Sequence, residues 1–345
     1  RRHPQSIDIP ASPARILVVR PGGIGDMVLL VPILRILGRR FPGAKMDLVC
    51  ESRNADVPKL AGIDAEILVY DRNPAALLAR LLSRRYDIAI DTEQFHHFSA
   101  FFAFLSGARI RIGFNINPRR NPVYTNCVNY AMDGAEGDQF MALLHPLGIK
   151  EAAPKVENIL AGYRTRLAPD KEQLLPAAGK YAVIHAGTSH MYKQWSVEYY
   201  AQLVAGLKSE MGVSSVLVGD RADRKLGEDI SEAAARTGME TPVVLSGLLS
   251  LAETTEVMRR AVLFAGTDSG LSHIALGLGI PRVVIFGPSD SRKWGFENKR
   301  NTIVRKDLPC SPCFILGYHK PCTTRSCMAQ ITAGDVLEAC RKVLR

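Results

Sequence analysis

Short apolar runs rich in β-branched residues alternate with helix-length segments along almost the whole chain. The runs are 15–19, 46–50, 66–70, 87–90 and 109–112 in the first half, and 181–185, 215–218, 242–245, 262–265, 282–286 and 302–305 in the second. Such runs, separated by segments such as 27–40 and 197–211, indicate βαβ units with parallel strands buried on both faces. The sequence therefore predicts an α/β fold.

The length of the chain favours two domains of this kind. Its 345 residues exceed the ~100–200 residues of a usual domain. The polar, proline-bearing stretch 163–180 is the best linker. We expect an N-terminal Rossmann-like domain over 1–165, a C-terminal Rossmann-like domain over 166–330 and a terminal amphipathic helix over 331–345. In such a pair, the carboxyl ends of both sets of strands face a central cleft, where open α/β sheets bind ligands.

The charge balance points to anionic partners. Lys and Arg outnumber Asp and Glu by 44 to 34, a net charge of +10. This sign fits nucleic acid, an acidic membrane surface or phosphorylated ligands equally well. The charges are spread along the chain and no recognition motif is present, so we expect no nucleic-acid partner.

Two features of the chain bear on its location. No apolar run approaches the 18 or more residues that read as a membrane-spanning helix. The chain opens Arg1-Arg2-His3-Pro4 with no apolar segment behind it, so we expect no signal peptide and a cytoplasmic location.

The first candidate motif is Arg20-Pro-Gly-Gly-Ile-Gly-Asp26, which follows a predicted strand and precedes a helix expected to start near Met27. Gly23 and Gly25 let the backbone approach a ligand closely, and Asp26 would stand at the helix start. An Asp there is also a common helix cap. The glycine spacing differs from the G-x-G-x-x-G fingerprint, so neither a nicotinamide nor a flavin cofactor is expected.

The second motif is His185-Ala-Gly-Thr-Ser189, which also follows a predicted strand. The hydroxyls of Thr188 and Ser189 and the ammonium of Lys193 suit a phosphate, which needs donors and a positive charge. Lys193 as an ordinary solvated lysine is the alternative.

The third motif is Gly266-Thr-Asp-Ser-Gly-Leu-Ser-His273, again at the junction of a strand and a helix. Free N–H groups near Ser269 and Gly270 would form an anion site, and Asp268 could accept hydrogen bonds from sugar hydroxyls. Equally, Asp268 could be a helix cap and His273 a packed residue of the first turn.

Taken together, these segments resemble the signature segments of glycosyltransferase family 9, the lipopolysaccharide heptosyltransferases, over Arg15 to Phe296. The resemblance implies a GT-B fold with an ADP-heptose donor held mainly by the C-terminal domain. It also implies transfer with inversion to a lipopolysaccharide core acceptor held by the N-terminal domain.

The resemblance also implies roles for individual residues. Asp26 is similar to the family's candidate base, and Thr188, Ser189 and Lys193 to its diphosphate contacts. Asp223 falls near an acidic ribose contact, and the segment from Asp268 through Ser269 and Gly270 matches the part that meets the heptose and phosphates. The full set of candidate substrate-binding residues is Gly23, Gly25, Thr188, Ser189, Asp223, Asp268, Ser269, Gly270 and His273, and the candidate catalytic residues are Asp26 and Lys193.

This chemistry needs no catalytic cofactor, because Lys193 and a helix dipole can take the place of a divalent cation at the diphosphate. The net charge fits an anionic donor and an acceptor at an anionic membrane surface, so we expect a protein peripheral to the inner membrane. A nucleotide-sugar epimerase of the same architecture and a non-catalytic sugar-nucleotide or glycan binding protein remain as alternatives. Asp26 with its glycine loop argues against the second.

Four cysteines lie close together beyond the shared segments, in the pattern Cys310-x2-Cys313-x8-Cys322-x4-Cys327. Four thiolates suit a closed, structural Zn or Fe site. A reduced surface loop, or one or two local disulfides, are the alternatives. Some relatives that modify other acceptors carry cysteine-ligated metal here, which leaves the acceptor open.

The run 95–105 contains five phenylalanines. It predicts a buried helix, with a helix at a membrane interface as the alternative.

Overall fold

The computed structural model describes residues 9–345 apart from 178, 237 and 239. The chain forms two compact units, which divide between Val156 and Glu157. This division precedes the expected boundary at residue 165, and the expected linker 163–180 belongs to unit 2. Residues 1–8, on which the expectation about a signal peptide rests, lie outside the described part of the chain.

Unit 1 contains a parallel sheet in the order β3-β2-β1-β4-β5-β6. Its strands are β1 (Arg15–Arg20), β2 (Lys45–Cys50), β3 (Glu66–Val69), β4 (Ile88–Asp91), β5 (Ile110–Phe114) and β6 (Asn126–Val128). The chain order reverses between the adjacent strands β1 and β4, and such a switch point is where open α/β sheets bind ligands. The loop that carries the first motif begins at this point.

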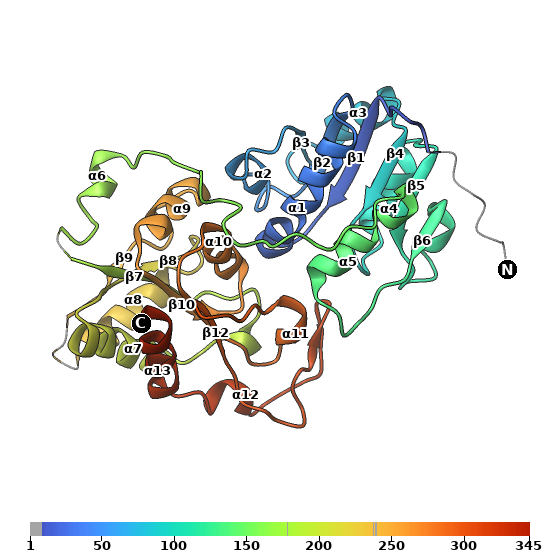
Figure 1. Ribbon diagram of the computed structural model, residues 1–345. Coiled ribbons are helices and arrows are strands. Elements are labelled where there is room, and N and C mark those ends of the chain that lie inside the picture. Colours follow the sequence, from blue (N-terminus) through green and yellow to red (C-terminus); the bar gives the residue numbers. More distant parts are fainter. Residues whose placement is uncertain (1–8, 178, 237, 239) are drawn as a thin grey trace. The chain divides into compact units, whose positions relative to one another are not determined.

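The described residues of this unit also form five helices, which accompany the strands in Figure 1. They are α1 (Ile24–Arg40), α2 (Val57–Leu60), α3 (Pro74–Ser83), α4 (Phe98–Leu105) and α5 (Glu136–Ala142), with 3-10 turns η1 (Asn121–Val123) and η2 (His145–Leu147). Helix α3 starts cleanly because Asn73 accepts a hydrogen bond from Ala76 N and Pro74 occupies the first turn. Leu77 of α3 and Phe102 of α4 pack in one cluster on the same face of the sheet.

Unit 2 contains a second parallel sheet, in the order β12-β11-β10-β7-β8-β9. Its strands are β7 (Tyr181–His185), β8 (Ser214–Val218), β9 (Val243–Val244), β10 (Leu263–Thr267), β11 (Arg282–Ile285) and β12 (Asn301–Val304), and a separate antiparallel pair consists of β13 (Phe314–Ile315) and β14 (Tyr318–His319). The switch point here lies between β7 and β10.

The helices of unit 2 cover both faces of this sheet. They are α6 (Pro169–Glu172), α7 (Val197–Met211), α8 (Arg224–Ala235), α9 (Leu251–Arg260), α10 (Gly270–Leu278), α11 (Ser291–Trp294), α12 (Ser326–Ala329) and α13 (Ala333–Leu344), with the 3-10 turn η3 (Met191–Lys193). Helix α13 begins at a capping box of Thr332 and Asp335, and its apolar face joins the core around α7. The terminal helix is therefore part of the core of unit 2.

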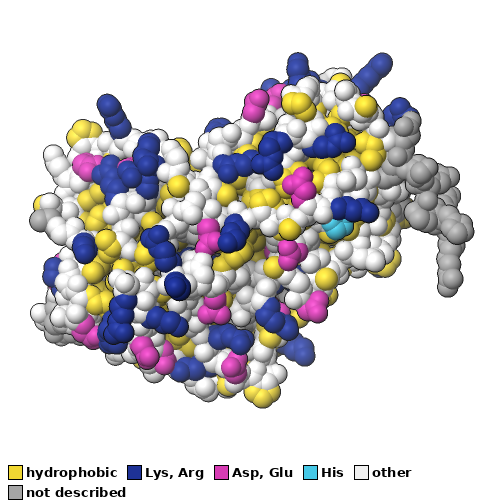
Figure 2. Space-filling model, in the orientation of Figure 1, with side chains coloured by type: hydrophobic (Ala, Val, Ile, Leu, Met, Phe, Trp, Pro, Cys, Tyr) yellow, Lys and Arg dark blue, Asp and Glu magenta, His cyan; other side chains and the backbone are white. Residues whose placement is uncertain are grey.

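Two surface properties concern the expected partners. Lys and Arg side chains are scattered over the face drawn in Figure 2 rather than gathered in one patch. Within the described residues, no helix combines the length and the apolarity needed to cross a bilayer.

Candidate active site

The glycine loop of unit 1 is held in place by a buried amide. Gly22 adopts φ +103°, which side-chain-bearing residues rarely adopt. Asn54 lies wholly buried beside it and donates from Nδ2 to the carbonyl oxygens of Arg20 (3.2 Å) and Gly22 (3.0 Å). Helix α1 begins at Ile24, three residues earlier than expected, with Gly23 at its N-cap. The loop therefore has one defined course between β1 and α1.

Asp26 lies in the first turn of α1, but its side chain does not cap the helix. Its Oδ2 instead lies 3.4 Å from the guanidinium of Arg20, and its side chain remains 23% exposed. Gly25 precedes it within the same turn. The capping role considered as the alternative is therefore not the one that the structure shows for this carboxylate.

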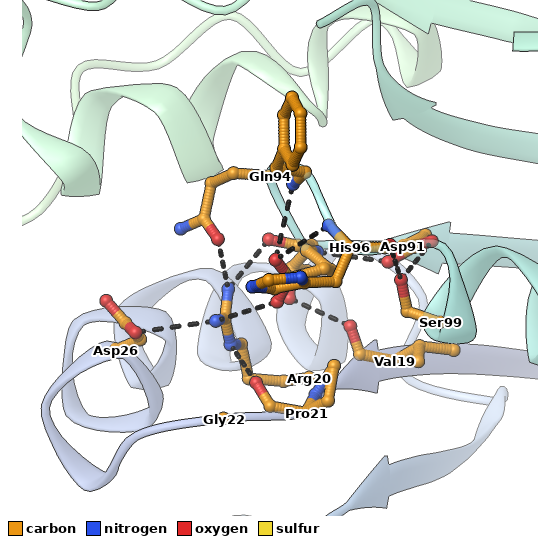
Figure 3. A network of polar contacts seen from close by, with 12 residues as sticks. Val19, Arg20, Pro21, Gly22, Asp26, Asp91, Gln94, His96 and Ser99 are labelled. Atoms are coloured by element: carbon orange, nitrogen blue, oxygen red, sulfur yellow. Dashed lines mark hydrogen bonds and ion pairs between the residues drawn. The ribbon is translucent and has the colours of Figure 1, made fainter. Parts of the chain in front are cut away.

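Arg20 forms the centre of a buried polar network (Figure 3). Besides Asp26, its guanidinium contacts Glu93 Oε2 at 3.3 Å and Gln94 Oε1 at 3.4 Å. It also donates to the carbonyl oxygens of Pro21 and Thr92, each at 2.8 Å. These contacts use donors on all three guanidinium nitrogens, so the orientation of Arg20 is fixed.

Further carboxylates surround this arginine. Glu136, wholly buried in the first turn of α5, accepts from Gln94 Nε2 and from the Tyr130 hydroxyl, each at 2.6 Å. Burial opposes the charge of Arg20, but Asp26, Glu93, Glu136 and Asp91 outweigh it and raise the pKa of Arg20 above its usual value. Arg20 is thus a permanent buried cation beside a partly exposed carboxylate.

The second and third motifs meet in unit 2 at the carboxyl ends of β7, β8 and β10. His185, the last residue of β7, contacts Ser269 Oγ through Nδ1 (2.9 Å) and Asp223 Oδ2 through Nε2 (3.4 Å). Ser269 is the N-cap of α10, so the imidazole links the amino ends of α8 and α10. Burial alone would raise the pKa of Asp223, but its interactions with His185 and the hydrogen bond from the Asp220 N–H together outweigh burial and hold that pKa below its usual value.

Asp223 fits closely because two neighbouring residues have no side chain. A Cβ on Gly187 would lie 2.1 Å from Asp223 Oδ1, and a Cβ on Gly219 would lie 2.4 Å from Oδ2. Asp223 Oδ2 also accepts from the backbone N–H of Asp220 at 3.0 Å. These two glycines therefore explain how a carboxylate can sit against the end of β7.

Lys193 and Asp268 form an ion pair of 2.9 Å, with side chains only 12% and 10% exposed. Burial alone would raise the pKa of Asp268, but Lys193, with smaller contributions from His273 and Ser289, outweighs burial and holds that pKa below its usual value. The ring of Phe314, from β13, lies 4.8 Å from the Lys193 Nζ. Lys193 is thus a fixed, partly desolvated cation next to the start of α10, and the reading of it as an ordinary solvated lysine does not match this structure.

The other predicted residues of unit 2 are more varied. Thr188 donates to the His190 carbonyl at 2.9 Å, and Ser189 is exposed in the loop that follows β7. Gly270 is the first residue of α10. His273 is buried, with its ring 6.4 Å from that of Phe296, and its charge contributes to lowering the pKa of Asp268. His273 is therefore a packed neighbour of Asp268.

The cysteine loop differs from the expected metal site. Among the described residues, no three His, Cys, Asp or Glu side chains are placed to hold a metal ion. Cys310, Cys313, Cys322 and Cys327 are free thiols. Burial raises the pKa of Cys327, and the charges of the other three raise it further, so the four thiols interact electrostatically.

Backbone contacts hold this loop against unit 2. The N–H groups of Cys313 and Phe314 both donate to the Pro288 carbonyl, at 2.8 and 2.9 Å. Cys327 is buried at the start of α12, in the core cluster of the unit. In this structure, the loop is fixed without the four thiols closing on one point.

Several residues at these two sites were not predicted from the sequence. Arg20 and His185 stand inside the first and second motifs, so their position at the carboxyl end of a strand was an available signal. Glu93 and Gln94 follow β4, a second available signal. No local sequence pattern indicates a functional role for the remaining three residues, Glu136, Asn54 and Phe314. Only the fold brings each of them to its site.

Two Rossmann-like units, each built on a parallel sheet, are the architecture of the GT-B fold. The chain belongs to glycosyltransferase family 9, whose model, described as "Glycosyltransferase family 9 (heptosyltransferase)", matches residues 75–323.

Individual relatives agree with this assignment. The chain is 27% identical over 326 residues to lipopolysaccharide heptosyltransferase 1 of Pseudomonas aeruginosa, covering 90% of this chain and 87% of that one. The structure of Escherichia coli ADP-heptose lipopolysaccharide heptosyltransferase II matches with a TM-score of 0.72 at 20% identity, covering 96% and 98%. The iron-containing dodecameric glycosyltransferase TibC from enterotoxigenic E. coli matches with a TM-score of 0.60 at 16% identity, covering 96% and 76%. These two structures are similar in fold.

Proposed function

We propose that the chain transfers a heptose from ADP-heptose to a lipopolysaccharide core acceptor, with inversion at the anomeric carbon. The observation that carries this proposal is the cluster of Lys193, Asp268 and Ser269 at the amino end of α10. A buried ammonium beside free helix N–H groups suits a diphosphate. The names of the relatives supply the sugar and the acceptor.

The donor site is proposed to lie wholly within unit 2. Lys193 and the N–H groups of Ser269 and Gly270 bind the diphosphate, and Asp268 holds Lys193 and accepts from a sugar hydroxyl. Asp223 accepts from a ribose hydroxyl, and Thr188 and Ser189 line the same loop. The ammonium and the helix dipole act most strongly on the charge that develops when ADP leaves.

The proposed acceptor side of the reaction is Asp26. Its carboxylate takes the proton from the acceptor hydroxyl while that oxygen bonds to the anomeric carbon of the heptose. The bond from this carbon to the β-phosphate oxygen breaks in the same step, and ADP departs with the electron pair. The partly exposed position of Asp26 leaves it accessible to an acceptor.

Arg20 is proposed as the positioning residue for this base. It holds Asp26 Oδ2 and is itself fixed by Glu93, Gln94 and two backbone carbonyls. A base that is held in one orientation reacts faster than one that samples several.

The cysteine loop is proposed to bind one structural Zn or Fe ion. Burial and the neighbouring cysteines raise the pKa of Cys313 and of Cys327, and a soft cation would relieve this unfavourable interaction. The printed description of TibC as iron-containing is consistent with this. Four thiolate ligands would leave no open position on the metal, so its role would be to fix the loop.

We place the reaction at the cytoplasmic face of the inner membrane, because a lipopolysaccharide core acceptor is anchored in lipid. Incubation with ADP-heptose and a lipopolysaccharide core, followed by mass spectrometry, tests the proposal. We expect the acceptor to gain the mass of one heptosyl residue and ADP to be released. An isomerised nucleotide sugar with an unchanged acceptor would indicate an epimerase, and binding without any product would indicate a non-catalytic protein.

A further inference from the structure

The helix expected to be buried at residues 95–105 exposes much of its aromatic surface. In α4, Phe102 is buried on the sheet, whereas Phe98, Phe101 and Phe104, three residues apart, lie on the outer side. In the neighbouring α3, Leu77 and Leu81 are buried, and Leu78 and Leu82 are exposed. The expectation of a buried helix was therefore wrong for half of its surface.

The five exposed side chains form what we call the α3–α4 patch. Their exposed fractions run from 40% for Leu78 to 63% for Leu82. The buried faces of both helices pack in the same core cluster and the helices contact each other, so the two outer faces are neighbours. Contiguous apolar surface of this kind usually marks an interaction site.

The charge around the patch is one-sided. Residues 72–120 include eight arginines, no lysine and only three acidic residues, a net charge of 8 − 3 = +5. Asp91 pairs with Arg120, and both are buried; Glu93 is buried against Arg20. Arg80 and Arg84 pair with Glu66 and Asp47, so the positive charge left at the surface comes from the other arginines of this segment. The carboxylate of Asp87 accepts hydrogen bonds from the backbone N–H groups of residues 14 and 15.

Two of these arginines stand free at one end of the patch. Arg85 follows α3 and Arg109 follows α4, and both are exposed. Within the described residues, neither forms an ion pair. Each precedes a strand, and these strands, β4 and β5, pair at Ile88 and Ile110. The two guanidinium groups therefore lie at the same edge of the sheet, beside the ends of the two helices.

We propose that the α3–α4 patch docks unit 1 on an anionic lipid surface. Exposed aromatic and aliphatic side chains enter the boundary between headgroups and acyl chains, while nearby arginines attract the headgroups. Pairing with a second copy of this chain through the patch is an outcome that the test below distinguishes. The inference deepens the proposed function, on which it rests for the lipid-anchored acceptor.

Sedimentation with vesicles tests this inference directly. The full chain is mixed with vesicles of phosphatidylglycerol and phosphatidylethanolamine, or of phosphatidylcholine alone. We expect binding to the anionic vesicles that weakens with added salt and is much weaker on the neutral ones. The triple variant Phe98→Ser/Phe101→Ser/Phe104→Ser should lose about tenfold or more of the partition coefficient.

A second variant keeps the apolar surface intact. Arg85→Gln/Arg109→Gln should weaken binding about fivefold for each arginine removed. Leu174→Ser, at an exposed leucine of unit 2, is the matched control and should bind as the wild type does. Heptose transfer to an acceptor freed of its acyl chains should be unchanged in all variants, which also shows that they fold.

Equal vesicle binding by the wild type and both patch variants would overturn the proposal, as would no binding by the wild type. A wild-type dimer that the Phe variant converts to a monomer, without any effect on vesicles, would assign the patch to a second copy instead. Vesicle binding that depends on the patch, with no transfer to the free acceptor by the wild type, would leave the docking surface standing and refute the proposed function.

Discussion

Asp26 owes its orientation to Arg20, a neighbour in the same glycine motif. The buried Arg20 guanidinium contacts one carboxylate oxygen of Asp26, and the first turn of α1 fixes the backbone of this residue. The Asp26 side chain neither caps the helix nor is buried, although an Asp at a helix start is usually a cap. A carboxylate that is oriented by a cation and yet accessible suits proton transfer better than helix stabilisation.

Asp26→Asn tests this assignment. The amide keeps the shape of the side chain but accepts protons poorly, so turnover should fall by ~10²–10⁴, the usual effect of losing an acid or base group. ADP affinity, measured by calorimetry, should stay the same, because the proposed donor site lies in unit 2. A parallel loss of ADP affinity would mean that Asp26 serves binding and not proton transfer.

Arg20→Lys separates a positioning role from a structural one. Lysine keeps the charge but cannot make the fork of contacts to Asp26, Glu93 and the backbone. We expect turnover to fall by ~10–100-fold with little change in KM, as for a misplaced catalytic group. The same substitution in an Asp26→Asn background should have almost no further effect on turnover. If the two losses multiply, Arg20 acts independently of Asp26.

Lys193→Ala removes the cation from a buried pair. ADP should bind more weakly and transfer should slow, because the ammonium faces charge present in the donor and growing in the leaving group. The carboxylate of Asp268 would be left buried without its cation, at a cost of about 3 kcal/mol in the free energy of unfolding. Lys193→Ala/Asp268→Asn should recover stability but not ADP affinity, which calorimetry and thermal unfolding can show.

The pH dependence of stability follows from the same pair. The pKa of Asp268 is lowered on folding, so its ionised form stabilises the fold above the ordinary Asp value, and this contribution disappears as the pH falls through the lowered pKa. Lys193→Ala should abolish this contribution. Its deficit in unfolding free energy relative to the wild type should therefore be largest near neutral pH and shrink in acid.

At the scale of elements, the cysteine loop is coupled to the donor site. Phe314 follows Cys313 directly and lies over Lys193. If the loop binds a metal, purified protein should contain about one Zn or Fe per chain. Cys313→Ser should lose this metal and weaken ADP binding by releasing Phe314. Phe314→Ala is the matched variant, and it should weaken ADP binding about 2–30-fold, the range of a cation–π contact, while retaining the metal.

Elemental analysis and calorimetry decide between the alternatives for this loop. Metal-free wild-type protein with four titratable thiols, or with disulfides, would refute the metal site. Weakened ADP binding in Phe314→Ala would still show that the loop reaches the donor site, whatever the state of its cysteines.

The elements that sequence reasoning predicted best are those with strong local signals. Helix α7 runs from Val197 to Met211 as predicted, because Ser196 caps its start and Gly212 ends it with φ +65°. Strands β6, β13 and β14 were missed because they contain only two or three residues, too few to form a pattern. Helix α4 was misjudged because its high content of phenylalanine conceals which face meets the sheet.

The two sites differ in how far the sequence revealed them. Lys193, Asp268 and Ser269 come together because each follows a strand of one sheet, and this rule can be applied without a structure. Glu136 and Asn54 reach the Arg20 network from α5 and from the segment between β2 and α2, far away in the chain. Buried polar partners of this kind depend on the packing of whole elements.

On the scale of the whole molecule, the two candidate sites belong to separate units. All residues of the proposed donor site lie in unit 2, whereas Asp26 and its network lie in unit 1. Each candidate site lies at the switch point of its own sheet. The two sheets therefore each provide one position of the kind at which open α/β sheets bind ligands. The proposed reaction divides in the same way, with the leaving group stabilised by one unit and the acceptor activated by the other.

Hydrogen exchange with and without ADP tests this division. ADP should slow amide exchange most strongly in unit 2, at 185–193, 219–224 and 266–273, because bound phosphates engage backbone N–H groups and oppose local opening there. The loop at 20–26 should change much less. Asp26→Asn should reproduce the wild-type pattern, and Lys193→Ala should lose most of the protection at the same ADP concentration. Protection of the 20–26 loop as strong as that of unit 2 in the wild type would mean that unit 1 also binds the nucleotide, and the proposed separation of leaving-group and acceptor chemistry would then be wrong.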